Sequence, residues 1–323
     1  SKTMEPGLRR LFGALLAMLP LAAVAQTPVD APDRIIKSGN LAYMAGFNRL
    51  YRLDLSTGAA TVVGTGFGTI GGAAVSDVKG LTFAPDGTLY AFADSPQALF
   101  RINTATGRAS LVGQFRENGQ LFDLSNNLNA TIVFTCSGKM LMSSRVQRKL
   151  WEVDPATAAV TTIGPLAPAI GGMSALGTDL YALGVAGSEG LFTITESSAQ
   201  SNRRSSALDG RNIAGGAIAF APNGRLFAVF DLFPQRPALA ELAPASGQIL
   251  SEVVLTGPQL GAGNDDQVVR ALAISAPVCA PSGFGGATAM PVPVAQPNAL
   301  ILLAAGLGLF ALAALGRRVA RPR

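Results

Sequence analysis

The sequence of 323 residues contains no histidine. Histidine is the side chain that most readily changes charge near neutral pH, and it is the commonest metal ligand. Its absence excludes Ser-His-Asp and Cys-His catalytic arrangements and every metal site that needs an imidazole. Chemistry on carboxylates, lysine or tyrosine remains open, so the absence argues against an enzyme without excluding one.

Positive charge is also scarce once the two ends are set aside, although the whole chain carries a net charge of +5. Seven of the 25 basic residues lie within positions 2–10 or 317–323, and one of the 20 acidic residues lies at position 5. The rest of the chain therefore has 18 basic and 19 acidic residues and a net charge of −1. No stripe of lysine or arginine remains to contact phosphates, so nucleic acid is not an expected partner.

A helical hydrophobic period is absent from the middle of the chain, which excludes a fold of alternating strands and helices. What the chain has instead is repetition. The phrase LYRLDLSTGAATVVG at 50–64 returns as LFRINTATGRASLVG at 99–113 and as LWEVDPATAAVTTIG at 150–164. Weaker copies follow at 191–195 and 239–250. Repetition at this period indicates a fold built from stacked copies of one small unit.

Each repeat reads as four short strands. A second phrase precedes the first, as GLTFAPDGTLYAF at 80–92 and GAIAFAPNGRLFAVF at 216–230. In its APDG and APNG turns, proline suits the first turn position and glycine suits a position where φ is positive. The strand segments around these turns are almost continuously apolar, which is typical of a sheet whose two faces are both buried.

Four-stranded sheets that recur about every 48 residues, each covered by its neighbours, predict an all-β fold, the β-propeller. Five four-stranded blades fit residues 39–276, and six blades, with residues 27–39 contributing, are the alternative. The first unit lacks its leading strand. The phrase RALAISA at 270–276 is predicted to supply that strand by pairing with residues 41–46, which closes the ring and leaves no open sheet edge.

The N-terminal segment predicts export. Two arginines precede an apolar run over 11–24, and Ala-Val-Ala at 23–25 fits a cleavage site of small residues. An apolar run of about fourteen residues suits a signal peptide better than a membrane span, and a buried core helix is the alternative. Residues 1–25 are therefore predicted to be a signal peptide, and residues 26–38 an N-terminal extension.

The C-terminal segment predicts a membrane anchor. Residues 299–316 carry no charge, and a helix of this length measures about 27 Å, close to the roughly 30 Å of a hydrocarbon core. Four arginines in 317–323 are expected on the cytoplasmic side, which places the body of the chain outside the inner membrane. Residues 277–298, rich in Pro, Gly and Ala, are predicted to form a linker.

The stretch MPVPVAQPNALILLAAGLGLFALAALGRRVARPR at 290–323 joins a proline motif, an apolar segment and a cluster of arginines. It resembles the C-terminal sorting signals of Gram-negative bacteria called PEP-CTERM and IPTL-CTERM. It departs from both, because no Glu lies between the prolines and Asn298 stands where the second type usually has Trp. The resemblance implies an exosortase-like membrane protease that moves the body to the cell surface, and a plain C-terminal anchor is the alternative. The motif residues are Val292, Pro293, Val294 and Ala295.

Charged residues recur shortly before the predicted innermost strands. In a propeller these connections gather around one mouth of the central channel, so the side chains are expected to form a binding rim of mixed charge. The alternative is that they are solvated loop charges that discourage pairing between sheet edges. Asp265 and Asp266 are candidate ligands of Ca²⁺, and no other cofactor, metal site or catalytic residue is predicted. The eight residues are Asp77, Lys79, Asp123, Asp209, Arg211, Asp265, Asp266 and Arg270.

The chain has only two cysteines, and an exported protein can join them in a disulfide. Cys136 follows the predicted innermost strand of the third unit, and Cys279 follows the closing strand. The innermost strands of a propeller run in the same direction, so both cysteines are expected on one face and a bond between them is predicted. The alternative is a buried apolar Cys136 and a free thiol at Cys279.

These features predict an exported β-propeller, associated with the envelope or cell surface, that binds another molecule without catalysis. The alternative is a propeller hydrolase or lyase that uses rim carboxylates, with or without Ca²⁺, since propellers host both classes. A third interpretation is a structural component of the cell surface. Three or more carboxylates converging in the channel mouth would favour the enzyme. Expected partners are signal peptidase, the sorting protease, the inner membrane before processing and an unidentified surface ligand.

Overall fold

A computed structural model describes residues 42–122, 128–258, 260 and 269–279. These residues form strands, turns and loops, and none of them is assigned to a helix. The described part of the chain therefore has no helix long and apolar enough to cross a membrane. The predicted signal peptide, the anchor at 299–316 and the sorting motif at 292–295 lie outside the described residues.

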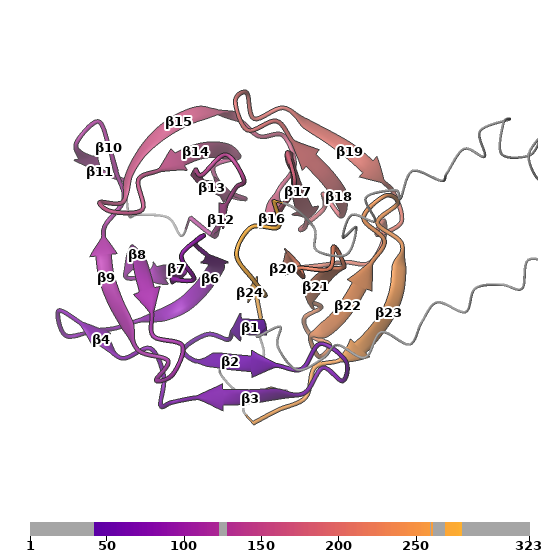
Figure 1. The fold of residues 1–323 in the computed structure, drawn as a ribbon, viewed down its shortest axis with the longest axis horizontal. Coiled ribbons are helices and arrows are strands. Elements are labelled where there is room, and N and C mark those ends of the chain that lie inside the picture. Colours follow the sequence, from indigo (N-terminus) through magenta and orange to yellow (C-terminus); the bar gives the residue numbers. More distant parts are fainter. Residues whose placement is uncertain (1–41, 123–127, 259, 261–268, 280–323) are drawn as a thin grey trace, which may run out of the picture. The chain divides into compact units, whose positions relative to one another are not determined.

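The strands form five antiparallel blades in a ring, which confirms the predicted five-bladed β-propeller (Figure 1). Blade 1 consists of β24 (Ala271–Ala273), β1 (Ala42–Ala45), β2 (Leu50–Leu53) and β3 (Ala60–Val63). Blade 2 consists of β6 (Ser76–Phe83), β7 (Leu89–Ser95), β8 (Gln97–Ile102) and β9 (Ala109–Gly113). Blade 3 consists of β12 (Ala130–Phe134), β13 (Met140–Ser144), β14 (Lys149–Val153) and β15 (Ala159–Pro165).

The remaining two blades follow the same pattern, and two small hairpins are added to the five blades. Blade 4 consists of β16 (Ile170–Leu176), β17 (Asp179–Gly184), β18 (Gly190–Ile194) and β19 (Ser201–Ser205). Blade 5 consists of β20 (Gly215–Phe220), β21 (Leu226–Asp231), β22 (Ala238–Leu242) and β23 (Ile249–Val254). The hairpin of β10 (Arg116–Glu117) and β11 (Gln120–Leu121) extends blade 3 beyond β15, and β4 (Thr69–Ile70) pairs with β5 (Ala73–Ala74).

The closing strand β24 completes blade 1 from the far end of the chain. It runs antiparallel to β1, with Ala273 opposite Tyr43 and Ala271 opposite Ala45. This pairing confirms the closure predicted from the truncated first unit. Because β24 completes blade 1, the ring closes with five blades, and the alternative of six is not adopted.

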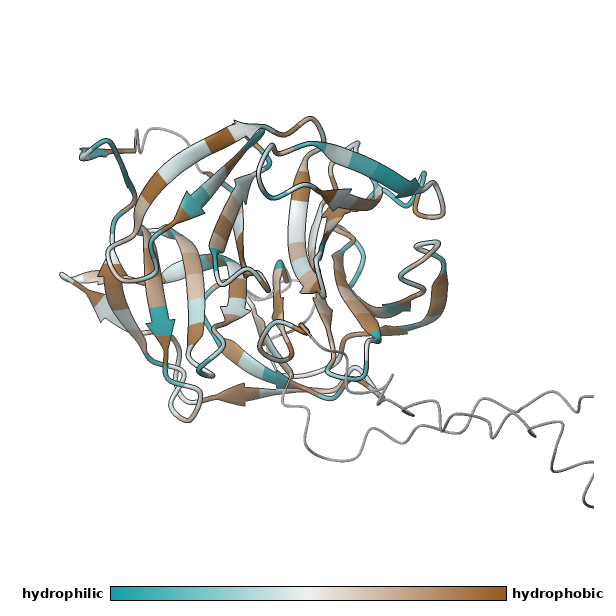
Figure 2. Ribbon diagram, turned by 45° about the horizontal axis from the view of Figure 1, so that its top comes forward, coloured by the Kyte–Doolittle hydropathy of each residue, from teal (hydrophilic) through white to brown (hydrophobic). Residues whose placement is uncertain are grey.

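The repeated phrase in the sequence is the outer half of a blade. Its three clear copies span β2–β3, β8–β9 and β14–β15. The inner strands are buried on both faces, as in β13 and β21, in which every residue is buried. Phe100 and Trp151 fill the spaces between neighbouring blades, and apolar residues line the interior of the ring (Figure 2). Each copy is needed because one blade alone would leave both of its apolar faces in water.

Small residues let the innermost strands approach one another closely around the axis. A Cβ atom on Gly80 would lie 2.9 Å from the backbone nitrogen of Ile132, and one on Gly172 would lie 2.4 Å from the Cα of Ala217. Hydroxyl groups then join the strands of neighbouring blades. The backbone N–H of Phe134 donates to Thr82 Oγ1 at 3.0 Å. The corresponding N–H of Phe220 donates to Ser174 Oγ, also at 3.0 Å.

A side-chain acceptor recurs in the turns of the outer hairpins. In each of three blades, Oδ1 of Asp54, Asn103 or Asp154 accepts the backbone N–H two residues further on, at 2.8–2.9 Å. Such bonds stabilise a local turn that the backbone alone would leave unsatisfied. The hydrogen bond from Thr157 is the first cause that lowers the pKa of Asp154 below its ordinary value. Ionised Asp154 is therefore favoured in the folded protein.

Replacing Asp154 tests this repeated turn. We expect Asp154→Ala to lower the free energy of unfolding by about 1 kcal/mol near neutral pH, because the turn loses its acceptor. Asp154→Asn keeps most of the stability, since Asn103 performs the same role in blade 2. The pKa of Asp154 is lower in the folded protein than in the unfolded chain. The stability that its ionised carboxylate contributes is therefore fully present above the unfolded pKa and is lost as the pH falls through the folded pKa. Urea unfolding of the three proteins across acidic pH measures this, and equal losses in both variants would contradict it.

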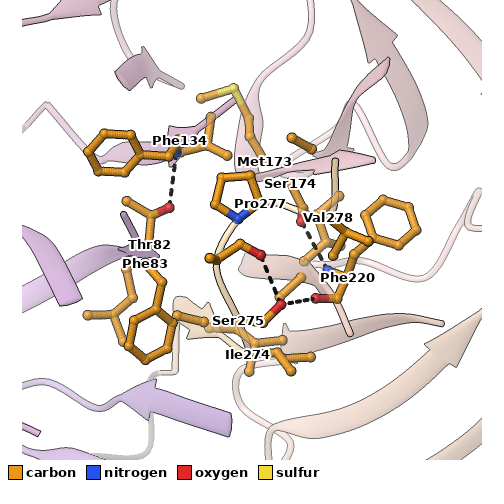
Figure 3. A pocket seen from close by; sticks show the side chains of 18 residues that line it. Thr82, Phe83, Phe134, Met173, Ser174, Phe220, Ile274, Ser275, Pro277 and Val278 are labelled. Carbon is orange, nitrogen blue, oxygen red and sulfur yellow. Dashed lines mark hydrogen bonds between the residues drawn. The ribbon is translucent and has the colours of Figure 1, made fainter. Parts of the chain in front are cut away.

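The segment after β24 closes the end of the channel at which the innermost strands finish, here called the closed mouth. Ser275 Oγ donates to the carbonyl of Phe220 at 3.4 Å, and the N–H of Gly177 donates to the carbonyl of Val278 at 2.7 Å. The chain thus crosses from blade 1 to blade 4, and Pro277 lies across the opening beside Met173 (Figures 1 and 3).

A disulfide fastens this crossing segment to blade 3. Cys279 is bonded to Cys136, which follows β12, and the two Cα atoms are 5.3 Å apart. The bond is the one predicted from the sequence, and it joins residues 143 positions apart.

Removing the disulfide should destabilise the ring. We expect the double variant Cys136→Ser/Cys279→Ser to lose up to about 5 kcal/mol of unfolding free energy, the loop-entropy value for this separation. Guanidinium unfolding without reductant measures the loss. Reductant should lower the stability of the wild-type protein to that of the variant and leave the variant unchanged. A variant as stable as the unreduced wild type would show that the bond contributes nothing.

Candidate functional site

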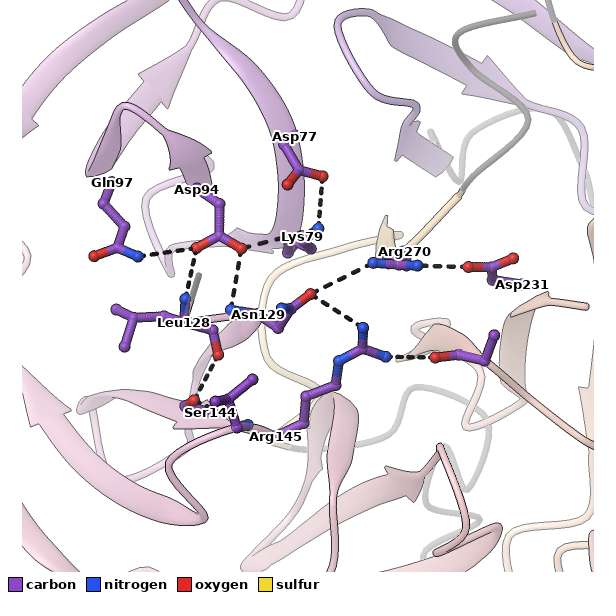
Figure 4. Close-up of polar contacts among 12 residues, drawn as sticks. Asp77, Lys79, Asp94, Gln97, Leu128, Asn129, Ser144, Arg145, Asp231 and Arg270 are labelled. Carbon is purple, nitrogen blue, oxygen red and sulfur yellow. Dashed lines mark hydrogen bonds and ion pairs between the residues drawn. The ribbon is translucent and has the colours of Figure 1, made fainter. Parts of the chain in front are cut away.

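Three of the eight predicted rim residues come together at the end of the channel where the innermost strands begin, here called the charged mouth. Asp77 and Lys79 lie in β6, and Arg270 directly precedes β24 (Figure 4). The side chain of Lys79 is 7% exposed and that of Arg270 is 21% exposed, so neither is a solvated loop charge. Three further members of the predicted rim lie outside the described residues: Asp123, Asp265 and Asp266.

The other two predicted rim residues, Asp209 and Arg211, were placed wrongly. Arg211 binds both carboxylate oxygens of Glu252 at 2.7 Å, and Asp209 pairs with Arg203. Both partners belong to outermost strands, β23 and β19. The connection from blade 4 to blade 5 starts at the outer edge of the ring, and its charges find partners there before the chain reaches the axis.

Lys79 is the buried cation on the blade 2 side of the mouth. Its Nζ lies 2.6 Å from Asp77 Oδ1 and 3.9 Å from Asp94 Oδ2. Burial lowers the pKa of Lys79, and the hydrogen bond to Asp77 opposes that shift. Asp77 adopts a left-handed backbone conformation with φ 58°, which Asp and Asn tolerate better than most residues.

Asp94 joins blade 2 to the start of blade 3. Its two carboxylate oxygens accept the backbone N–H groups of Leu128 and Asn129, each at 3.0 Å, and Gln97 Nε2 donates to it at 3.3 Å. Burial raises the pKa of Asp94, and the positive charge of Lys79 is the main influence in the other direction. The carboxylate therefore holds the backbone in place as well as balancing Lys79.

Two arginines meet on the opposite side of the mouth and share one neutral acceptor. Asn129 Oδ1 accepts from Arg145 Nη2 at 3.1 Å and from Arg270 Nη1 at 3.4 Å (Figure 4). Arg270 also donates from Nε to Asp231 Oδ2 at 3.0 Å. Arg145 donates from Nη1 to the carbonyl of Ala214. Two like charges are thus held beside one amide oxygen.

Arg145 differs from the other cations of the mouth in its partners. Both of its partners named above are uncharged, and no carboxylate in the described part of the chain forms a salt bridge with it. Burial lowers the pKa of Arg145, and the nearby charge of Arg270 adds to the shift. A guanidinium keeps its proton in proteins even so. The charges of Asp231, Asp94 and Asp77 oppose that shift without forming a salt bridge to Arg145 within the described residues.

Glycines form the floor between these cations. A recess of about 10 Å³, with room for about one water molecule, is lined by Lys79, Arg145, Arg270 and three glycines at positions 171, 215 and 216. A Cβ on Gly215 would lie 2.8 Å from Arg270 Nε. Glycine at this position lets the arginine lie against the backbone of β20.

Four residues of the charged mouth were missed by sequence reasoning: Asp94, Asn129, Arg145 and Asp231. The sequence could have indicated Asp94 and Asp231, because the matching phrases LYAFAD at 89–94 and LFAVFD at 226–231 both end in Asp. No comparable repeat marks the amide and the arginine. Within the described ranges, no three His, Cys, Asp or Glu side chains are grouped to hold a metal ion.

Comparison with known proteins yields similar structures at low sequence identity. No family model and no curated protein sequence matches the chain. It is similar to a chain in a nidogen/laminin complex, at 10% identity and TM-score 0.45, covering 73% of this chain and 98% of that one. It is also similar to a streptogramin B lyase, at 13% identity and TM-score 0.38, covering 67% of this chain and 59% of that one. A gluconolactonase from Xanthomonas campestris matches at 13% identity and TM-score 0.42, covering 68% of this chain and 70% of that one. Similarity at this level assigns no activity.

A double-mutant cycle tests the buried pair of Lys79 and Asp94. We expect Lys79→Met and Asp94→Asn each to lower stability by a few kcal/mol, because each leaves a buried charge with fewer partners. The double variant should lose less than the sum, with a coupling of about 0.5–3 kcal/mol.

The matched control is the exposed pair of Lys139 and Glu152, whose side chains are 48% and 42% exposed. Its cycle, Lys139→Met with Glu152→Gln, should give a clearly weaker coupling, because water screens the charges of an exposed pair. Denaturant unfolding measures both cycles. Equal coupling energies at the two places would contradict a buried network at the mouth.

Proposed function

We propose that this protein is an exported, envelope- or surface-associated binding module that does not catalyse a reaction, and that its ligand contacts the charged mouth. The observation that carries the proposal is the contrast between the two ends of the channel. One end holds six charged side chains, and three of them, Lys79, Arg145 and Arg270, line a small recess. The other end is crossed by residues 275–279 and fastened by a disulfide.

The burial of these charges supports a functional role for the mouth. Taking an ion out of water is unfavourable, and a buried ion pair seldom stabilises a fold more than apolar residues of the same size would. The side chains of Asp94 and Asp231 are 1% and 2% exposed, so the penalty applies to both. Clusters of this kind are commoner at binding and catalytic sites than elsewhere.

The positions of the carboxylates favour binding over a hydrolase or lyase that works through them. A general base or a Ca²⁺ ligand needs an oxygen that faces the substrate or ion. Both oxygens of Asp94 accept backbone N–H groups. In Asp231, Oδ1 accepts the N–H of Phe233 and Oδ2 accepts from Arg270. These acids are occupied in holding the mouth together.

Export is proposed from the two ends of the sequence, and the disulfide supports it. Disulfides persist in oxidising compartments such as the periplasm and the cell surface, and they are rare in the cytosol. The bond between Cys136 and Cys279 suits a body that matures outside the inner membrane. Under this proposal, signal peptidase and the sorting protease act on the segments at 1–25 and 292–295.

Release and rebinding test the proposal together. Cells of a Gram-negative host that make the full chain should release a protein whose mass lacks residues 1–25 and the arginines after 316. That released protein should rebind saturably to envelopes from cells without it. Arg145→Gln should weaken rebinding about tenfold or more, the loss expected for a charged contact.

Lys139→Gln is the control, because Lys139 is exposed and pairs with Glu152 away from the mouth. It should rebind like the wild type. A released species that retains Arg323 would contradict processing. Equal rebinding by both variants would contradict the mouth as the binding surface.

A further inference from the structure

We infer that the face around the charged mouth binds the surface of an anionic lipid bilayer, through three exposed apolar side chains and the cations beside them. This rests on the proposed function in one respect, the association of the body with the envelope. It adds the partner, which is lipid, and it places the contact on the turns that surround the mouth.

Three exposed apolar side chains, here called the apolar tips, occupy the same position in three blades. They are Phe47, Val146 and Phe233, which are 39%, 52% and 56% exposed. Each lies in the turn between the second and third strands of its blade, in blades 1, 3 and 5. In the described part of the chain, the other large apolar residues with such exposure lie on the outermost strands β9 and β23 and on β11. Single exposed apolar residues are common on proteins, whereas a position shared by three blades is a pattern.

Backbone contacts hold each apolar tip beside the charged mouth. In blade 1, the carbonyl of the tip residue accepts the N–H of Asp77 at 2.5 Å. In blade 5, the N–H of the tip residue donates to Asp231 Oδ1 at 3.2 Å. In blade 3, the tip residue directly follows Arg145. All three of these charged residues belong to the mouth, so the apolar tips surround it on one face of the ring (Figure 4).

Exposed cations lie next to the apolar tips. Arg148 and Lys149 follow the tip of blade 3, and Arg236 lies three residues after the tip of blade 5. All three are exposed, and none of them forms a salt bridge within the described residues. The turn of blade 4 carries one half-buried acid, Glu189. The mouth itself holds three cations and three carboxylates, so the turns around it give this face its positive charge.

An apolar side chain next to a cation suits the surface of an anionic bilayer. The apolar group leaves water for the boundary of the acyl chains, while the lysine or arginine stays among the anionic headgroups. The arrangement disfavours a protein partner, because the anchors of a protein interface cluster at its centre inside a polar rim. Here the charges lie at the centre and the apolar tips lie around them.

The ends of the described chain lie away from this face. Ala42, at the start of β1, and Cys279 are both at the closed mouth. The segments attached to these two residues therefore begin at the opposite end of the channel from the apolar tips. A body anchored through its C-terminus can thus present the tips to a second lipid surface, and a released body keeps them for reattachment.

The first experiment places a reporter tryptophan on the face. Phe233→Trp, and Leu250→Trp as the control, are made in the full chain and reconstituted in vesicles whose acyl chains carry bromine, which quenches tryptophan on contact. Leu250 is 60% exposed on the outermost strand β23, and the native Trp151 is 1% exposed and contributes equally to both. In phosphatidylglycerol vesicles the reporter at position 233 should lose most of its fluorescence, and the control should lose little. Both proteins carry the same apolar segment at 299–316, so that segment cannot cause the difference.

The lipid charge and the protein charge are then varied. Phosphatidylcholine vesicles should quench the same reporter weakly, because they offer no anionic headgroup to the cations. Adding Lys149→Gln and Arg236→Gln should reduce the ratio of lipid-bound to free faces by about fivefold for each charge removed. The control pair is Lys139→Gln with Arg52→Gln, two exposed cations away from these turns, and it should leave the quenching unchanged. Phe47→Trp repeats the whole test on blade 1 if Phe233→Trp folds poorly.

The outcomes separate this inference from the proposed function. Equal quenching of Phe233→Trp and Leu250→Trp, or equal quenching by phosphatidylglycerol and phosphatidylcholine, overturns the inference even if the released protein rebinds to envelopes through Arg145. Quenching at the tips without envelope rebinding keeps the lipid contact and overturns the surface role. Envelope rebinding that Phe233→Ala weakens, while lipid does not quench the reporter, identifies a protein partner and also overturns the inference.

Discussion

The antiparallel pairing of β24 with β1 is the contact on which the ring depends. Each blade has two apolar faces and can bury neither of them alone, so the five sheets are stable only as a closed set. Closure requires the two ends of the propeller sequence to meet in one sheet, and only three residue pairs make that meeting. The hydroxyl groups of Thr82 and Ser174 and the glycines at 80 and 172 then allow the innermost strands to approach one another at the axis.

Closure also makes the two ends of the channel unlike. All innermost strands run the same way, so the turns that precede them meet at one mouth and the turns that follow them meet at the other. The strand that closes the ring supplies a residue to each end: Arg270 to the charged mouth and Cys279, a little further on, to the closed mouth. A short segment of chain therefore contributes both to the candidate site and to the bond that fastens the ring.

The fold could be predicted from the sequence because repetition, turn residues and continuous apolar strands all indicate the same unit. The candidate site could be predicted only in part. Residues at the start of an innermost strand, such as Lys79 in β6, were found because topology brings those positions together. Arg145 lies after a second strand and reaches the mouth through its long side chain, which no spacing reveals. Asp209 and Arg211 show the converse. Their connection starts at the outer edge of the ring, and both side chains form ion pairs there before the chain reaches the axis.

The disulfide has a mechanical consequence for a chain held by its C-terminus. Tension applied through the residues after Cys279 enters the folded body at that residue, and the covalent bond passes it to Cys136 and blade 3. The three-residue strand β24, which would otherwise be peeled from β1 one hydrogen bond at a time, lies outside this load path. Blade 3 receives the load in the middle of the propeller sequence, where β12, β13 and β14 are paired along five residues each. A pull on the chain beyond Cys279 would therefore act on blade 3 next to the end of β12 and would leave the pairing of β24 with β1 unloaded.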